Sequence, residues 1–159
     1  MILKPDYNLK SLFDIDIEAL RQKGVEALLF DLDSTVMASG AGVYCKKVYS
    51  WLCELKKDFK IAVVSNNTNE KYLDNIRRQS CFDVIGNAKK PATKVTLDYL
   101  NSIEVKPENT VVIGDRPLTD IMLGKKLGAA TILVDSITCD TEHKIVRFVR
   151  ALERLVIRR

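Results

Sequence analysis

The sequence contains little histidine and no long apolar run. A single histidine, His143, among 159 residues excludes a metal centre built on several imidazole ligands. No apolar run approaches the roughly 20 residues that a membrane-spanning helix needs. The first residues reach Lys4 and Pro5 too soon to contain the roughly 7–15-residue apolar core of a secretory signal. We therefore expect a soluble protein that is not exported, with His143 on its surface.

The four cysteines lack a recognisable pattern. Cys45, Cys53, Cys81 and Cys139 show no CxxC spacing and lie in or beside apolar segments. This placement favours reduced thiols over a disulfide framework or a zinc site, and it fits a cytoplasmic protein. The formal net charge of +4 is mild, and we expect no nucleic-acid partner.

Short apolar runs alternate with longer segments of helical periodicity, in a chain long enough for one domain. The runs predict strands at 25–31, 60–65, 83–85, 110–113 and 130–134. The periodic segments predict helices at 15–23, 44–57, 70–79, 93–101 and 118–127, the last with Gly128 as its C-cap. This alternation is typical of βαβ units. We expect a single-domain, doubly wound α/β fold with a parallel sheet flanked by helices.

Polar residues follow the predicted strands. Asp31 and Asp33, in the stretch FDLDST, come directly after an apolar run and share one face if the chain stays extended, so their charges repel unless a cation lies between them. Functional residues of such sheets gather at the carboxyl edge. The other strand ends supply Ser65, Asn66, Asn67, Lys89, Lys90, Pro91, Gly114, Asp115, Arg116, Thr119 and Asp120.

Several carboxylates without cysteine or histidine companions form the hard oxygen site that Mg²⁺ prefers, and Mg²⁺ leaves positions open for phosphate oxygens. Asp31 is the natural nucleophile for an aspartyl-phosphate, and Asp33 can serve as general acid and base. Ser65 and Lys90 can hold the transferring phosphoryl group. Each short motif alone is weak, and Asp120 can also be a helix-start charge. Their common edge and order favour the catalytic interpretation.

Four segments, DLDST, VVSNN, AKKP and VVIGDRPLTD, resemble in order the four motifs of the haloacid dehalogenase (HAD) superfamily of phosphatases. The resemblance implies Mg²⁺ as cofactor and a phosphorylated substrate. It implies Asp31 as nucleophile and metal ligand, Asp33 as acid/base and backbone-carbonyl ligand, and Asp115 as metal ligand. It implies Ser65 and Lys90 (rather than Lys89) as phosphate binders, and Asp120 as an outer-shell partner of the metal. We expect Thr35, Asn66 and Gly114 to be supporting residues.

The short spacings between these motifs leave no room for a separate cap domain, so the chain resembles the capless subclass IIIA, with the loop 36–43 as its only lid. An open site suits a substrate with its own bulk: a protein, a nucleic acid end or a lipid headgroup.

We divide the chain into a lead-in (1–24), a catalytic core (25–135) and a C-terminal helix (141–159).

The predicted C-terminal helix is basic and amphipathic. Its apolar residues share one face, and the other face carries Arg147, Arg150, Arg154 and Arg158. Such a helix can lie on an anionic membrane surface, or its apolar stripe can pack on the sheet with the arginines in water. The two arrangements are compatible.

More closely, the layout resembles the YqeG-type branch of the superfamily, which includes mitochondrial and plastid phosphatidylglycerophosphate phosphatases. The shared features are SLFDI before the first strand, SNN, KP, IGDRPLTD and the arginine-rich tail. These relatives more often read DKDNTL where this chain has DLDSTV, with Leu32 and Ser34 as the differences. The resemblance favours phosphatidylglycerophosphate as substrate. A soluble phosphometabolite or nucleotide and, in another class, a non-catalytic binding module are the alternatives.

Overall fold

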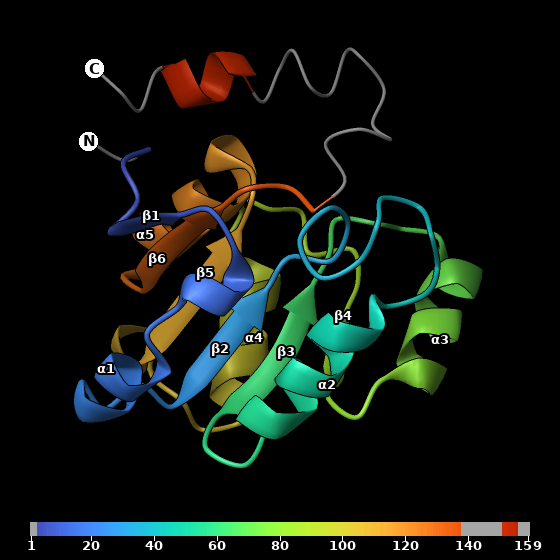
Figure 1. Cartoon of the computed structure of the whole chain (residues 1–159), viewed down its shortest axis with the longest axis horizontal. Coiled ribbons are helices and arrows are strands. Elements are labelled where there is room, and N and C mark those ends of the chain that lie inside the picture. Colours follow the sequence, from blue (N-terminus) through green and yellow to red (C-terminus); the bar gives the residue numbers. More distant parts are fainter. Residues whose placement is uncertain (1–2, 138–150, 156–159) are drawn as a thin grey trace.

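A six-stranded sheet forms the centre of the computed structural model, which describes residues 3–137 and 151–155 (Figure 1). Its order is β1-β6-β5-β2-β3-β4, and every neighbouring pair is parallel. The strands are β1 (Tyr7–Leu9), β2 (Ala27–Phe30), β3 (Lys60–Val64), β4 (Asp83–Ile85), β5 (Thr110–Gly114) and β6 (Ala130–Val134). The prediction of a single-domain α/β fold with a parallel sheet is confirmed.

Helices cover both faces of the sheet. One face packs against α1 (Ile17–Gln22), α2 (Lys46–Leu55) and α3 (Glu70–Gln79), and the other packs against α4 (Lys94–Ser102) and α5 (Met122–Leu127). In Figure 1, α2 lies in front of the sheet and α4 behind it. The two layers follow from the chain order, because right-handed crossovers on the two sides of β2 place their helices on opposite faces.

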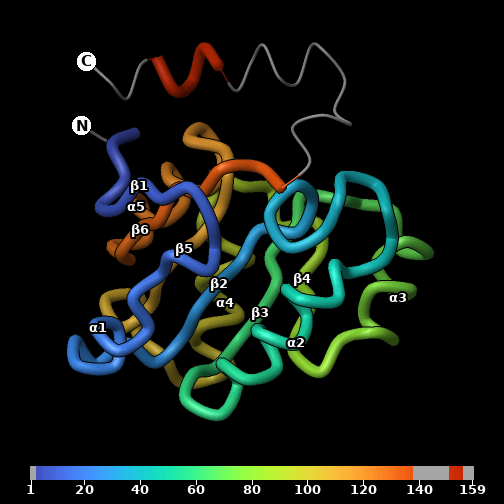
Figure 2. The backbone as a smooth tube through the Cα atoms, viewed as in Figure 1, coloured from blue at the N-terminus to red at the C-terminus, as the bar shows by residue number. Residues whose placement is uncertain are grey.

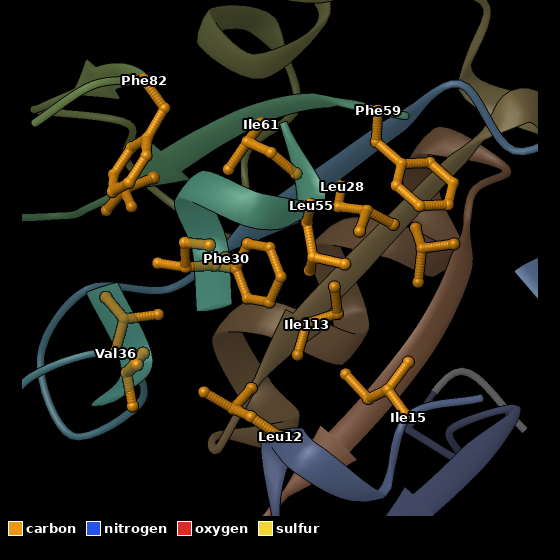
Figure 3. Packing of buried hydrophobic residues seen from close by; sticks show 14 of the residues in the cluster. Leu12, Ile15, Leu28, Phe30, Val36, Leu55, Phe59, Ile61, Phe82 and Ile113 are labelled. Carbon is orange, nitrogen blue, oxygen red and sulfur yellow. The ribbon is translucent and has the colours of Figure 1, made fainter. Parts of the chain in front are cut away.

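Residues of β2 alternate between these two layers. Leu28 and Phe30 pack with α1, α2 and α3, whereas Ala27 and Leu29 pack with α4 and α5. Figure 3 shows Leu28 and Phe30 among the buried hydrophobic residues on the face of the sheet that α1, α2 and α3 cover. A central parallel strand is buried on both sides, which is why its sequence is a continuous apolar run and not an alternating one.

The edge strand β1 was not predicted. Its three residues are mostly exposed and show no alternation, so neither length nor pattern indicates a strand. Pairing with β6, Tyr7 beside Ile132, creates it, and Figure 2 shows β1 alongside β6. The predicted helix at 118–127 also differs, because it begins as a π-helical turn, Pro117–Ile121, before α5. It ends as predicted at Gly128, whose φ of +79° suits glycine.

The expectation of reduced cysteines is wrong for one pair. Cys53 in α2 and Cys81, just after α3, form a disulfide. The two lie 28 residues apart, and packing of α2 beside the start of β4 brings their Cα atoms to 6.6 Å. Cys45 is a free, exposed thiol. Cys139 and His143 lie outside the described residues.

The carboxyl end of β2 lies between those of β3 and β5, and the chain winds away from β2 in both directions. This switch point is where open α/β sheets place their ligand sites. In the part of the chain that the structure covers, no helix combines the length and the apolar character that crossing a membrane requires.

Candidate active site

Asp31 is held at the end of β2 by the neighbouring strand. Its backbone N–H donates to the carbonyl of Ile113, at 2.9 Å, so β5 continues the ladder one residue beyond β2. The chain then turns sharply, because the carbonyl of Leu32 accepts from the backbone N–H groups of Thr35, Val36 and Met37. The turn buries Leu32 and Val36 in the core and directs the polar residues between them to the sheet edge.

Lys90 lies between two carboxylates. Its Nζ donates to Asp31 Oδ1 at 2.5 Å and to Asp120 Oδ1 at 2.8 Å, and its side chain is only 3% exposed. Burial alone lowers the pKa of a lysine, but the charges of Asp120 and Asp31 outweigh it and raise the pKa of Lys90 above its ordinary value. Lys90 is therefore a permanent cation at this site. Lys89, the alternative considered from the sequence, is exposed.

Three carboxylates surround one point. Oxygen atoms of Asp31, Asp115 and Asp120 all lie within 4.8 Å of one another, and Asp115 and Asp120 are buried. Burial, followed by the charge of Asp31, raises the pKa of Asp120 to about 6, against the lowering effect of Lys90. A divalent cation would lower it again. Clustered carboxylate oxygens fit Mg²⁺ as ligands.

Thr35 and Gly114, predicted as supporting residues, lie beside this cluster. The Thr35 hydroxyl donates to Asp115 Oδ1 at 3.2 Å. At Gly114 a Cβ atom would lie 2.2 Å from Asp120 Oδ2, so only glycine lets that carboxylate pack against the strand. The same Oδ2 accepts the backbone N–H of Arg116 at 3.2 Å.

The carboxylate of Asp33 has a separate environment. Its Oδ1 accepts from the Tyr72 hydroxyl and from the backbone N–H of Gly40, both at 3.0 Å. Burial and the nearby charge of Asp33 raise the pKa of Tyr72 to about 12, so this hydroxyl stays protonated and donates. Gly40 belongs to the predicted lid loop, which is also tied to α3 because Gly42 accepts from Asn75 and Gln79. Sequence reasoning missed Tyr72, and no local pattern distinguishes it from other half-buried residues of α3.

Asn66 fixes the loop that carries Lys90. Its side-chain Nδ2 donates to the Lys90 carbonyl at 2.9 Å, and its Oδ1 accepts the Lys90 backbone N–H at 2.6 Å. Ser65 is held by a hydrogen bond from its backbone N–H to the carbonyl of Ile85. Its hydroxyl accepts the backbone N–H of Asn67 at 3.1 Å, which leaves the hydroxyl hydrogen for a ligand.

These residues share one cavity of about 300 Å³ at the carboxyl edge of the sheet. The structure thus brings together the residues predicted as nucleophile, acid/base and phosphate binders, although they come from separate strand ends. The lining consists of Asp31, Asp33, Ser34, Ser39, Ser65, Asn66, Asn67, Lys90, Arg116 and Thr119.

The C-terminal segment 151–155 is helical and contacts the core through charged residues. Glu153 is buried and forms an ion pair with Arg116, and Arg154 bonds to Asp135 and to the carbonyl of Val134. Leu152 and Leu155 are 47% and 59% exposed, so this part of the predicted apolar stripe does not pack on the sheet. The other predicted membrane-facing residues, Arg147, Arg150 and Arg158, lie outside the described residues.

With this geometry in place, relatedness to known proteins identifies the family. Residues 1–138 match the family model described as mitochondrial PGP phosphatase, where PGP is phosphatidylglycerophosphate. The chain belongs to the PGP phosphatase family. It is a phosphatase of the HAD superfamily, as the four motifs predicted.

Two relatives extend this family assignment. The "Probable phosphatase YqeG" of Bacillus subtilis is 32% identical over 154 residues, which are 96% of this chain and 88% of the relative. The "Phosphatidylglycerophosphate phosphatase 1, chloroplastic/mitochondrial" of Arabidopsis thaliana is 30% identical over 98% of this chain but only 47% of its own length. This chain thus spans most of the bacterial relative and about half of the plant relative.

A solved structure supports the fold of this PGP phosphatase family member. A predicted HAD-like family hydrolase from Porphyromonas gingivalis superposes with a TM-score of 0.56. At 15% identity, the match covers 81% of this chain and 98% of that protein. The sheet and its helices thus share the fold of that protein.

Proposed function

We propose that this phosphatase hydrolyses phosphomonoesters in a Mg²⁺-dependent reaction through an aspartyl-phosphate on Asp31, and that its substrate is phosphatidylglycerophosphate at a membrane surface. One observation carries the catalytic part: the ammonium of Lys90 lies between the carboxylates of Asp31 and Asp120, at the edge where Asp115 completes an acidic cluster. This arrangement holds a nucleophile, a fixed cation and metal ligands together.

In the first step a carboxylate oxygen of Asp31 forms a bond to phosphorus as the ester P–O bond breaks, and Asp33 gives a proton to the leaving oxygen. In the second step water attacks the same phosphorus, Asp33 takes a proton from it, and inorganic phosphate leaves with Asp31 restored. The Tyr72 hydroxyl and the Gly40 N–H orient Asp33 from the side. Lys90 and the Ser65 hydroxyl bind the equatorial phosphoryl oxygens.

The side chains of Asp31 and Asp115 fit Mg²⁺ as ligands by their oxygen chemistry and their mutual distance, and Asp120 lies beside them as the outer-shell partner. The backbone carbonyl of Asp33 is the remaining proposed ligand. When bound, the ion supplies positive charge that lets an anionic nucleophile approach an anionic phosphate. Thr35 keeps Asp115 oriented through its hydroxyl, and Gly114 leaves room for Asp120. Because Asp115 and Asp120 are buried and accept hydrogen bonds, little reorganisation is needed when the cation binds.

Family membership, the activity named for the plant relative and the composition of the C-terminal segment support the lipid substrate. Leu152 and Leu155 expose apolar side chains on the segment whose Glu153 contacts Arg116 at the cavity. Exposed leucines near arginines suit an anionic membrane surface. We therefore propose an enzyme that binds peripherally to the inner face of the membrane.

The decisive experiment measures phosphate release with Mg²⁺ from phosphatidylglycerophosphate in mixed micelles and from a panel of soluble phosphomonoesters. Asp31→Asn serves as the inactive control. We expect a strong preference for the lipid. Release from soluble esters alone would keep the catalytic assignment and discard the lipid, and no release from any substrate would contradict the proposed function.

Membrane contact has its own test. Arg147, Arg150 and Arg158 are changed together to Gln, and Arg154 is kept because it bonds to Asp135. If the tail binds anionic vesicles, the triple variant should bind them more weakly at low salt, by about 1 kcal/mol per arginine removed. Vesicle co-sedimentation with and without anionic lipid measures this difference. Equal binding by both proteins would exclude the arginines as the contact.

A further inference from the structure

Arg116 stands apart from the other basic residue of the cavity. Among the described residues that line the cavity, Lys90 and Arg116 are basic. Lys90 is buried against Asp31 and Asp120, so it serves the reacting phosphate. The side chain of Arg116 is 37% exposed, and its place immediately after Asp115 brings it to the same cavity. The catalytic assignment gives Arg116 no role.

The guanidinium of Arg116 forms an ion pair with a carboxylate from the C-terminal segment. Nη2 of Arg116 lies 3.6 Å from Oε1 of Glu153, whose side chain is only 2% exposed. A nearby cation stabilises a buried carboxylate, and Arg116 supplies a positive charge at this distance. Because the Nε–H of Arg116 is buried, the exposed remainder of its side chain is the part that can bind a ligand in the cavity.

The segment that carries Glu153 is anchored to the sheet edge. Arg154 Nη1 donates to Asp135 Oδ1 at 2.6 Å, and its Nη2 donates to the Val134 carbonyl at 2.9 Å. Just after Asp135, the backbone N–H of Ile137 donates to the carbonyl of Ser34, a residue that lines the cavity. Glu153 thus approaches Arg116 from a fixed position at the border of the cavity.

We propose that Arg116, positioned by Glu153, binds a second, non-reacting phosphate group of the substrate and selects phosphomonoesters that carry one. The planar fork of an arginine matches a phosphate, and an arginine bound to a carboxylate on one side is oriented to bind an anion with its other donors. In phosphatidylglycerophosphate the phosphodiester, one glycerol unit from the reacting monoester, is such a group. This inference rests on the proposed function and deepens it.

The first test compares two soluble substrates without acyl chains, so that membrane binding plays no part. They are the deacylated headgroup of phosphatidylglycerophosphate, which retains the phosphodiester, and glycerol 3-phosphate, which lacks it. Hydrogen bonds to charged groups contribute roughly 1.5–3 kcal/mol. Arg116→Ala should therefore lower the kcat/KM for the deacylated headgroup, relative to that for glycerol 3-phosphate, by roughly 10–100-fold. Arg78→Ala, at an exposed position on α3, is the matched control and should keep the ratio. Equal losses on both substrates in Arg116→Ala would overturn the proposal.

The second test addresses Glu153 as a positioning residue. Glu153→Gln keeps the size of the side chain and removes its charge, so KM for the headgroup should rise by roughly 3–10-fold with kcat unchanged, in line with an effect of about 1 kcal/mol on binding alone. Glu153→Asp should recover part of this loss, and Glu108→Gln controls for charge. Thermal melting verifies that each variant is folded. A fall in kcat with an unchanged KM would contradict the positioning role.

A binding measurement separates failure of this inference from failure of the proposed function. Calorimetry with Mg²⁺ compares binding of the deacylated headgroup to Asp31→Asn and to Asp31→Asn with Arg116→Ala. At least tenfold weaker binding in the double variant supports the role of Arg116, even if the unaltered protein releases no phosphate and the proposed reaction fails. Equal binding by both proteins would overturn the role of Arg116, whatever the turnover.

Discussion

The two edges of the sheet carry cavities that differ in how their polar side chains are bound. The cavity at the amino ends of β3 and β4 is the larger, about 440 Å³ against about 300 Å³ at the carboxyl edge. It also contains lysines, a tyrosine and an aspartate. Each is engaged locally: Lys56 donates to the Cys81 carbonyl, Lys60 to the Ile103 carbonyl, and Tyr99 to Asp83 at 2.8 Å. These side chains are bound pairwise at the surface.

At the carboxyl edge the polar side chains converge instead. Lys90 contacts two carboxylates from different strand ends, and Asp115 and Asp120 are buried although they are acidic. Burying like charges together is unfavourable unless a cation compensates them, so this edge keeps an arrangement that stability alone does not favour. Convergence of buried charge, and not cavity size, therefore distinguishes the functional edge. Each edge offers matched side chains, and these allow direct tests of the difference.

The largest expected difference is in kcat, between variants of Asp31 at the carboxyl edge and of Asp83 at the amino edge. Asp31→Asn removes the proposed nucleophile and should lower kcat by roughly a thousandfold or more, because an amide oxygen is a poor nucleophile for the proposed aspartyl-phosphate step. Asp83→Asn, at the amino edge, should leave kcat within about twofold, as expected for a surface change. Steady-state phosphate release measures both. Appreciable turnover by a folded Asp31→Asn protein would remove Asp31 as the nucleophile.

The next comparison is between Lys90 and Lys60. Lys90→Met leaves buried carboxylates without their cation and should lower the free energy of unfolding by roughly 3–5 kcal/mol in Mg²⁺-free buffer. Lys60→Met removes an exposed ammonium and should change it by about 0.5 kcal/mol or less. Urea denaturation followed by circular dichroism gives both values. If the two variants lost similar stability, the edges would not differ in the way proposed.

A third prediction assigns the disulfide to stability. A cross-link that closes a loop of 28 residues contributes roughly 2–4 kcal/mol in the chain-entropy account. Cys53→Ser should therefore lower the unfolding free energy by about that amount without changing kcat/KM at a temperature where the variant is folded. Cys45→Ser, which alters a free thiol, is the control. A clear loss of kcat/KM in folded Cys53→Ser would show that the amino edge influences catalysis.

The smallest expected effect distinguishes two tyrosines that both donate to an aspartate. Tyr72→Phe removes a hydrogen bond to Asp33, and the less well oriented acid/base should lower kcat by roughly 3–10-fold, the equivalent of about 1 kcal/mol. Tyr99→Phe removes the corresponding bond to Asp83 and should leave kcat unchanged. Single-turnover phosphate release measures the chemical step. Identical rates for both variants would exclude Tyr72 as a positioning residue.

Most of the catalytic edge could be predicted because its signals are local. An apolar run followed by an acid marks both Asp31 and Asp115, and parallel strands bring such ends to one edge. Tyr72 and Glu153 could not be predicted as site residues. Tyr72 reaches the site because α3 buries Leu73 and Ile76 against the sheet, and Glu153 reaches it on a segment that contacts the core through charged residues. Neither residue follows a strand end.

By itself the sequence determined five of the six strands, the order of these strands and the helices, and the α/β class, because hydrophobic periodicity is a property of short segments. It also supplied the strand-end residues whose motifs resemble those of HAD phosphatases. Only the tertiary structure decided that β1 pairs with β6, that Cys53 joins Cys81, and that Glu153 contacts Arg116. These contacts join segments distant in the chain. Their partners are selected by packing and by the compensation of buried charge, which no local pattern encodes.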